Sequence, residues 1–309
     1  MSNHDVVVVG TVCCDIIFHG LPSFPKLGEE VWTKGMDVTA GGAINSPAAL
    51  SRLGVNVGIV TPIGNDIWGD IIYSKLKAEE ICTNLIYKVD KTLPQISVAM
   101  NYQNDRAFVS YGEKVEVSDY HQHLEKVIHE STAKLFHFYA SSEPGHTEML
   151  LEAKQRGKLI SLDTGWDPEW LTSDQIKEQI ALSDIFLPNL SEASLITGKK
   201  DKYEALYALA ELVPNIVIKL GEAGAIAHYK GKVYESKTGY QKVVDATGAG
   251  DCFIAGYLYG WLNNKSTLEC LKIGNYCGGA CVTSVGGYTG APTKAEIVNN
   301  MIIEIDVKK

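Results

Sequence analysis

The stretch DATGAGDCFIAGYLYGWL, residues 245–262, sets two carboxylates around a glycine turn and then continues without a charge. The run from 252 to 262 is apolar on every side, which predicts a helix buried at the centre of the fold. If Asp251 opens this helix, the amides of residues 248–251 are free donors at its positive end. Glycines at 248 and 250 let a ligand approach the backbone closely. The stretch therefore predicts an anion cradle suited to a phosphoryl group in transfer.

The carboxylate of Asp251 would weaken a site that only binds anions. Its position makes sense if it accepts a proton from a hydroxyl that attacks phosphorus. An aspartate at a helix N-terminus is also a common cap, and glycines often form tight turns. Taken alone, the stretch leaves both interpretations open.

Outward from this stretch, the chain alternates between short β-branched runs and helical patterns. The first run, at 5–10, reads DVVVVG, and similar runs follow at 58–61, 135–139, 159–163, 184–187 and 216–220. Helical patterns occupy 48–53, 68–79, 146–156, 173–182 and 202–212. This alternation predicts an α/β fold with a mostly parallel sheet covered by helices on both faces. Without an internal repeat or linker, we expect one domain over residues 1–309.

Two segments, 16–38 and 95–111, break the alternation. The first carries several prolines and glycines, and the second reads as two alternating strands around a turn at 103–105. Neither has a crossover helix, so both are expected to pair in antiparallel fashion. They predict a small sheet, from about 12–40 and 93–112, that projects as a lid over a site.

Composition excludes several classes of protein. The 309 residues carry a net charge of −9 without a basic run, which argues against nucleic acid as a partner. Neither a signal peptide nor a membrane span is predicted, and seven scattered cysteines fit a reducing cytoplasm. GTVCC at 10–14 replaces the dinucleotide fingerprint, and the P-loop pattern is absent from the sequence.

Five motifs in order resemble the ribokinase-like (PfkB) family of carbohydrate kinases. They are GGAINSPAALSRLG at 41–54, PIGNDIWG at 62–69, LPNLSEA at 187–193, IKLGEAGA at 218–225 and DATGAGDCFIAG at 245–256. The resemblance covers nearly the whole chain. It implies an ATP-dependent kinase acting on a sugar or nucleoside hydroxyl, with a three-layer α/β/α fold and a small β-sheet lid.

The resemblance also implies the residues that bind the acceptor. Asp251 would be the general base, with Gly248, Ala249 and Gly250 as the anion hole. The sugar hydroxyls would be held by Asp251 together with Asp15, Gly41, Gly42 and Asn45. Taken in isolation, the paired glycines would be interpreted as a turn and the asparagine as a helix cap, rather than as sugar-binding residues.

A second set of residues is implied for the nucleotide and its ions. Asn189, Lys219, Gly221, Gly224 and Asn275 would contact ATP, and Glu192 would hold Mg²⁺ through water. Asn189 alternatively caps the helix that starts near 191. The resemblance extends to a monovalent cation such as K⁺, held by Asp245, Thr247, Val282, Val285 and Gly287.

Two departures bear on the acceptor. Cys13 stands where ribokinases have an asparagine, and the segment 140–142 lacks the glutamate that lies over the sugar. Both changes remove hydrogen bonds to ribose and argue against it. The leading hypothesis is phosphorylation of a monosaccharide hydroxymethyl group. The alternatives are a nucleoside kinase and a non-catalytic sugar-binding regulator, and a homodimer through the lid is predicted.

Overall fold

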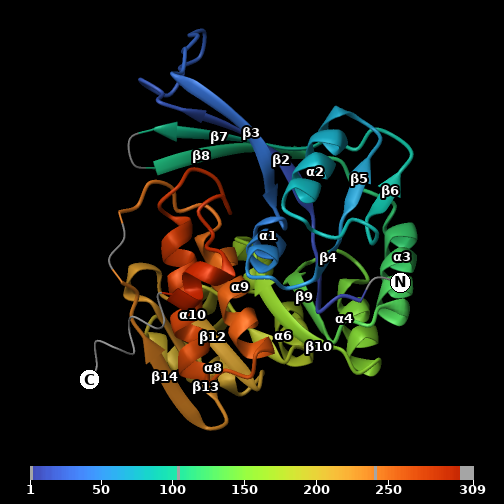
Figure 1. Ribbon diagram of the computed structural model, residues 1–309, viewed down its shortest axis with the longest axis vertical. Coiled ribbons are helices and arrows are strands. Elements are labelled where there is room, and N and C mark those ends of the chain that lie inside the picture. The colour runs from blue at the N-terminus through green and yellow to red at the C-terminus, as the bar shows by residue number, and fades with distance from the viewer. Residues whose placement is uncertain (1–2, 103–104, 240–241, 300–309) are drawn as a thin grey trace.

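The structure is a computed structural model and describes residues 3–102, 105–239 and 242–299. Its centre is an eight-stranded sheet (Figure 1). In spatial order the strands are β14 (Lys232–Ser236), β13 (Ala225–Tyr229), β12 (Asn215–Lys219), β11 (Ile185–Phe186), β10 (Leu159–Thr164), β9 (Leu135–Ala140), β1 (Val6–Val9) and β4 (Val57–Val60). All neighbours from β4 to β12 are parallel, and β13 and β14 add an antiparallel edge. The predicted mostly parallel sheet is confirmed.

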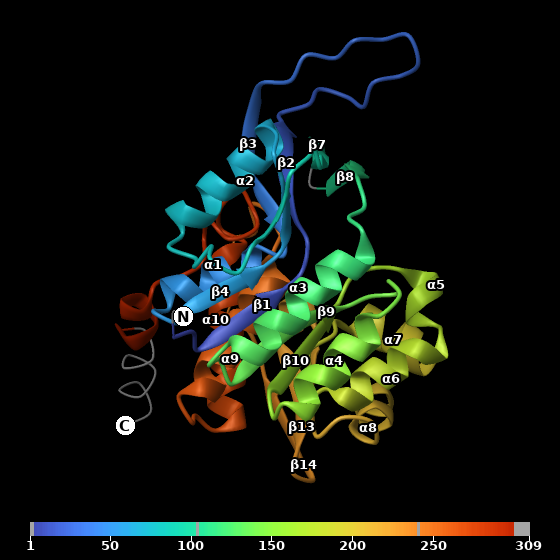
Figure 2. The ribbon, with the colours of Figure 1, turned by 90° about the vertical axis from the view of Figure 1, so that its right-hand side faces the viewer.

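Helices cover both faces of this sheet, as Figure 2 shows. One face packs against α1 (Asn45–Arg52), α2 (Ile67–Ala78), α9 (Ala249–Leu262) and α10 (Thr267–Cys281). The other packs against α3 (Val117–Glu130), α4 (His146–Gln155), α5 (Pro168–Leu171), α6 (Asp174–Leu182), α7 (Leu190–Thr197) and α8 (Lys202–Ala210). In β1, Val6 and Val8 enter the first core and Val7 and Val9 the second. A strand buried on both faces therefore has no polar alternation, and the three-layer fold is confirmed.

A separate four-stranded sheet projects from the main body (Figures 1 and 2). Its order is β3 (Gly35–Gly42), β2 (Val12–His19), β7 (Gln95–Tyr102) and β8 (Asp105–Gly112). These strands come from the two segments from which the lid is predicted. The pairs β2–β3 and β7–β8 are antiparallel, but β2 and β7 are parallel, so the expectation of wholly antiparallel pairing is wrong. Residues 43–94 return the chain to the same end of the sheet, and such a long connection permits a parallel pair.

The sequence did not predict the short parallel pair β5 (Pro62–Gly64) and β6 (Tyr87–Val89). Nor did it predict the 3₁₀ turn η1 (Gly221–Ala223) after β12. Within the described residues, none of the helices is both long and apolar enough to cross a bilayer.

The central helix α9 is buried along nearly its whole length, as its apolar sequence predicts. It begins at Ala249 rather than at Cys252, because Gly248 adopts a left-handed conformation with φ of 69° and starts the helix earlier. Asp251 consequently lies inside the first turn. Helix α10 packs directly on α9, and its Cys270, Cys277 and Cys281 are buried in the core.

Two buried histidines make stability depend on pH. Burial lowers the pKa of His137 to about 3 and that of His146 to about 4, so both are neutral in the folded protein at pH 7. In the unfolded chain these histidines take up protons near pH 6.5. Their contribution to stability is therefore complete above that pH and is lost as the pH falls, down to about 4 for His146 and about 3 for His137. For His137, which donates to or accepts from Ser161 at 3.0 Å, the loss at pH 5 is about 2 kcal/mol.

Urea unfolding at pH 7 and pH 5 measures this effect. His137→Asn keeps a polar group near Ser161 but cannot take up the proton. We expect the free energy of unfolding of this variant to fall less between the two pH values, by about 2 kcal/mol, than that of the wild type. Equal falls in both proteins would show that His137 does not contribute.

Candidate active site

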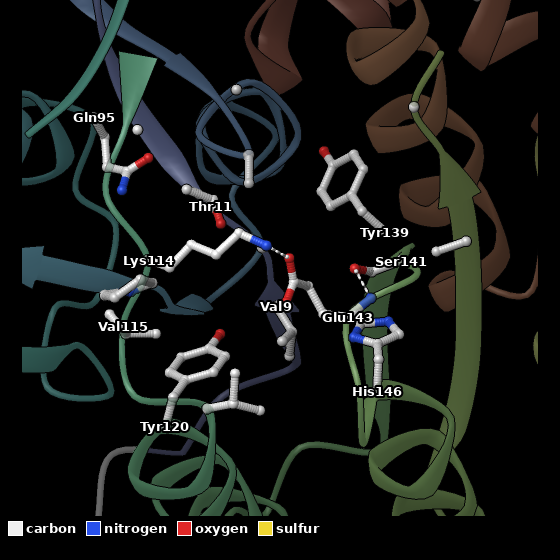
Figure 3. Close-up of a pocket in the computed structure, with 18 of the residues that line it drawn as sticks. Val9, Thr11, Gln95, Lys114, Val115, Tyr120, Tyr139, Ser141, Glu143 and His146 are labelled. Carbon is white, nitrogen blue, oxygen red and sulfur yellow. Dashed lines mark hydrogen bonds and ion pairs between the residues drawn. The ribbon is translucent and has the colours of Figure 1, made fainter. Parts of the chain in front are cut away.

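A cavity of about 630 Å³ lies at the carboxyl ends of β1, β9 and β10 (Figure 3). Val9, Tyr139 and Asp163 line it from these three strands, and Asp251 lines it from α9. Ligands of parallel α/β sheets commonly bind at this edge, because the loops after the strands diverge there. The cavity is therefore the candidate acceptor site.

The carboxylate of Asp251 is held by side chains from two other elements. The amide of Asn45 donates to Oδ2 at 3.0 Å, and the hydroxyl of Tyr139 donates to Oδ1 at 2.8 Å. Ser46 Oγ lies 3.3 Å from the same Oδ1. Asn45 begins α1 without capping it, so its interpretation as a helix cap is wrong. The structure thus brings two of the predicted substrate residues, Asn45 and Asp251, into direct contact.

The expectation of four free amides at 248–251 needs one correction. The amide of Ala249 donates to the carbonyl of Ala246 at 3.4 Å, because the chain tightens into a turn before α9. No acceptor within the described ranges takes the amides of Gly248, Gly250 or Asp251. These remaining donors lie at the positive end of a fourteen-residue helix, where a phosphate is stabilised.

The other predicted sugar residues divide into two groups. Gly42 lines the cavity, whereas Asp15 and Gly41 lie next to each other outside its lining. A Cβ at Gly41 would lie 2.0 Å from Asp15 Oδ2, so the glycine makes room for this carboxylate. Burial raises the pKa of Asp15, and the thiol of Cys13 donates to it at 3.2 Å.

A second cavity of about 600 Å³ holds four of the residues predicted for ATP and Mg²⁺. Asn189, Glu192, Lys219 and Gly221 line it. Asn189 and Glu192 form a reciprocal cap of α7, with bonds of 2.9 and 2.7 Å, so the capping interpretation is confirmed. A Cβ at Gly221 would meet nothing within 4 Å, which leaves the backbone open to a ligand. The carboxylate, the amide and the open backbone fit a nucleotide with its magnesium ion.

An ion pair joins the two cavities. Lys219 Nζ of the second lies 2.9 Å from Asp163 Oδ1 of the first, and both side chains are buried. Burial opposes the charge of Lys219, but the carboxylates of Asp163 and Glu192 outweigh it and raise the pKa of Lys219. The lysine therefore stays positive between the cavities, beside the start of α9 at Gly250.

Gly224 and Asn275 lie outside the lining of the second cavity. The amide of Asn275 donates to the carbonyl of Ser236 at 2.9 Å, and a Cβ at Gly224 would lie 2.1 Å from the same oxygen. Both residues therefore contact the last residue of β14, Asn275 through a hydrogen bond and Gly224 through close backbone packing. The structure does not bring them together with Lys219 and Gly221.

The five predicted cation ligands lie in two loops that are joined by hydrogen bonds. Asp245 Oδ1 accepts from the amide and hydroxyl of Thr247, and Asp245 Oδ2 accepts from the amide of Gly286. The carbonyl of Val282 accepts from the amides of residues 244 and 245. The carbonyls of Val285 and Gly287 accept from a Thr289 hydroxyl and from two cysteine thiols, respectively. A buried carboxylate among carbonyl oxygens fits an alkali cation by donor type.

Sequence reasoning missed Tyr139, Ser46 and Asp163. Tyr139 and Asp163 end or nearly end β9 and β10, and a polar residue at the carboxyl end of a parallel strand is the signal that could have found them. His121 of α3 also lines the first cavity.

The fold and the two cavities are of the ribokinase-like type, and the comparisons identify the family. Residues 3–294 match the pfkB family carbohydrate kinase profile, so the chain belongs to this family. It is 27% identical over 307 residues to a ribokinase of Haemophilus influenzae, covering 94% of this chain and 96% of the relative. It is 26% identical over 302 residues to a nucleoside kinase of Methanothermobacter thermautotrophicus, covering 96% and 95% of the two chains.

Solved structures confirm the fold. Arabidopsis thaliana ribokinase complexed with ribose and ATP superposes with a TM-score of 0.81 at 22% identity, covering 96% of this chain and 98% of that one. A putative ribokinase II from Escherichia coli in complex with ATP and Mg²⁺ has a TM-score of 0.83 at 23% identity, with the same coverage. The family and fold expected from the five motifs are thus confirmed.

Proposed function

We propose that the protein transfers a phosphoryl group from ATP to the hydroxymethyl group of a monosaccharide, with Asp251 as general base. The observation that carries the proposal is the position of Asp251. Its carboxylate lines the first cavity, while the free amides of Gly250 and Asp251 lie in the same turn of α9. A proton acceptor and an anion cradle therefore occupy one site.

Each step of this phosphoryl transfer can be assigned to residues of the two cavities and of the start of α9. Asp251 takes the proton of the acceptor hydroxyl as the oxygen attacks, and Asn45 holds the other oxygen of the carboxylate. The amides of Gly250 and Asp251, with the helix dipole, stabilise the growing charge on the phosphoryl group. Glu192 would hold Mg²⁺ through water, and Lys219 would face the phosphates. Bound ATP–Mg²⁺ supplies the phosphoryl group.

A coupled assay of ADP release tests the proposal. Purified protein is mixed with ATP and Mg²⁺, with and without K⁺, and offered a panel of monosaccharides and nucleosides. We expect turnover with at least one monosaccharide that carries a free hydroxymethyl group. Sugar binding without any ATP turnover would instead favour a regulatory protein on the same scaffold.

One observation favours the second candidate, a nucleoside kinase. The first cavity is lined by Val115, Val117, Tyr120 and His121, and Figure 3 shows Val115 and Tyr120 on the side opposite Tyr139. Such a wall suits a planar apolar group larger than a sugar alone. Turnover confined to nucleosides in the same assay would establish this alternative.

We propose further that two copies pair through their lids. Met36, Val109 and Tyr111 are exposed on one face of the small sheet, on its outer strands β3 and β8, and Val109 is 63% exposed. Covering these side chains with a second lid would remove apolar surface from water.

Sedimentation at micromolar concentration tests the pairing. The wild type is expected to sediment as a dimer, and Val109→Asp as a monomer with unchanged helix content, because the carboxylate would be buried at the contact. A monomeric wild type would contradict the proposal.

A further inference from the structure

Two hydroxyl groups surround one oxygen of the Asp251 carboxylate. Tyr139 donates to Oδ1 at 2.8 Å, and Ser46 Oγ lies 3.3 Å from Oδ1 and 3.0 Å from the Tyr139 hydroxyl. The three side chains come from β9, α1 and α9, so this triangle forms only in the folded protein. Asn45 holds Oδ2 separately.

The backbone leaves Tyr139 little freedom. A Cβ at Gly10 would lie 2.8 Å from Tyr139 Cδ2, so the ring lies directly against this glycine. The ring of His137 packs on its other side edge-on, with centroids 5.0 Å apart. A rotamer change of Tyr139 therefore requires movement of the strand ends, and the hydroxyl has a fixed place.

The phenol can donate a proton in a hydrogen bond but cannot replace Asp251 as the base. Burial, together with the negative charge of Asp251, raises the pKa of Tyr139 well above its usual range. Ser46 is fully buried beside these two side chains. The hydroxyl of Tyr139 therefore acts on the Asp251 carboxylate as a hydrogen-bond donor.

We propose that Tyr139, supported by Ser46, is a positioning residue that holds Asp251 Oδ1 toward the acceptor cavity. The inference rests on the proposed role of Asp251 as base. A hydrogen bond to a charged oxygen favours the charged form and fixes its direction. Asp163, Glu192 and Lys219 also face Asp251 across the site, as does the adjacent Cys252, and replacement of Tyr139 leaves all four in place.

Tyr139→Phe, which keeps the ring, tests the inference. We expect kcat/KM for the acceptor to fall about tenfold, with KM for ATP unchanged, because one hydrogen bond to a charged group is lost. The loss should lie in kcat rather than in KM for the acceptor, because Tyr139 acts on the base that takes the proton.

Tyr257→Phe is the matched control. Tyr257 is a buried tyrosine of α9 whose hydroxyl donates to Asn215 at 3.1 Å, remote from Asp251 in the hydrogen-bond network. Loss of the Tyr257 hydroxyl should lower thermal stability without changing kcat. A purely structural role of Tyr139 would give the same result as this control.

Asp251→Asn, measured in the same series, separates the two proposals. If Asp251→Asn keeps wild-type turnover, the proposed function fails. If Asp251→Asn is inactive while Tyr139→Phe keeps the kcat of the wild type, only the inference about Tyr139 is overturned. In support of it, the residual rate of Asp251→Asn should not fall further when Tyr139→Phe is added.

Discussion

Asp251→Asn is expected to lower kcat by about 10²- to 10⁴-fold, the usual contribution of a positioned general base. The amide has nearly the size of the carboxylate but cannot accept the hydroxyl proton. ATP affinity should change little, because the second cavity contains Glu192 and Lys219 and is not lined by Asp251. Steady-state rates and nucleotide titration of the same variant measure both quantities.

The N-cap of α9 is Gly248 and no side chain of the described residues caps this helix, so the interpretation of Asp251 as a cap is wrong. If Asp251 only stabilised the first turn of α9, its replacement by asparagine would leave turnover unchanged. Asp201 provides the comparison, because its carboxylate caps α8 by accepting from the amides of Tyr203 and Glu204. Asp201→Asn should keep full activity. Full activity of both variants would rule out Asp251 as the base.

Gly248→Ala is expected to produce the second-largest effect. A Cβ at Gly248 would lie 1.8 Å from the carbonyl oxygen of Gly287, which is backbone and cannot rotate away. The methyl group must therefore displace either the start of α9 or the loop at 282–287, and with it the free amides. We expect kcat to fall about 10²-fold or more, as when a donor to the developing charge is removed.

Gly198→Ala is its matched control. Gly198 has the same φ of 69° and a similar ψ, but a Cβ there would meet nothing within 4 Å. It should lose only about 1 kcal/mol of stability from the left-handed backbone and keep its rate. If both variants had equal rates, the contact between Gly248 and Gly287 would not hold the anion cradle in place.

Regular patterns in the sequence predicted the fold well. Val6–Val9 has no polar alternation because both faces of β1 are buried, and α9 has no polar face because sheet and helices surround it. These patterns are local, so periodicity alone reveals them. The motifs also named Asn45 and Asp251, which lie far apart in sequence and in contact in space.

Contacts between distant elements could not be predicted in the same way. Tyr139 and Ser46 reach Asp251 only because β9 ends and α1 begins beside α9. Ser46 lies in the motif at 41–54 and Tyr139 ends a predicted strand, but neither pattern shows which residue it contacts. The parallel pairing of β2 with β7 depends on the path of residues 43–94 between them. The bond from Ala249 to Ala246 depends on the turn geometry at Gly248 rather than on residue type.

A crystal structure with Mg²⁺, a non-hydrolysable ATP analogue and the acceptor found in the assay tests the central claim most directly. If Asp251 is the general base, we expect the reacting hydroxyl within about 2.6–3.2 Å of an Asp251 oxygen and the terminal phosphate facing the amides of Gly250 and Asp251. An acceptor hydroxyl bound out of reach of Asp251, or a phosphate held away from the start of α9, would contradict it.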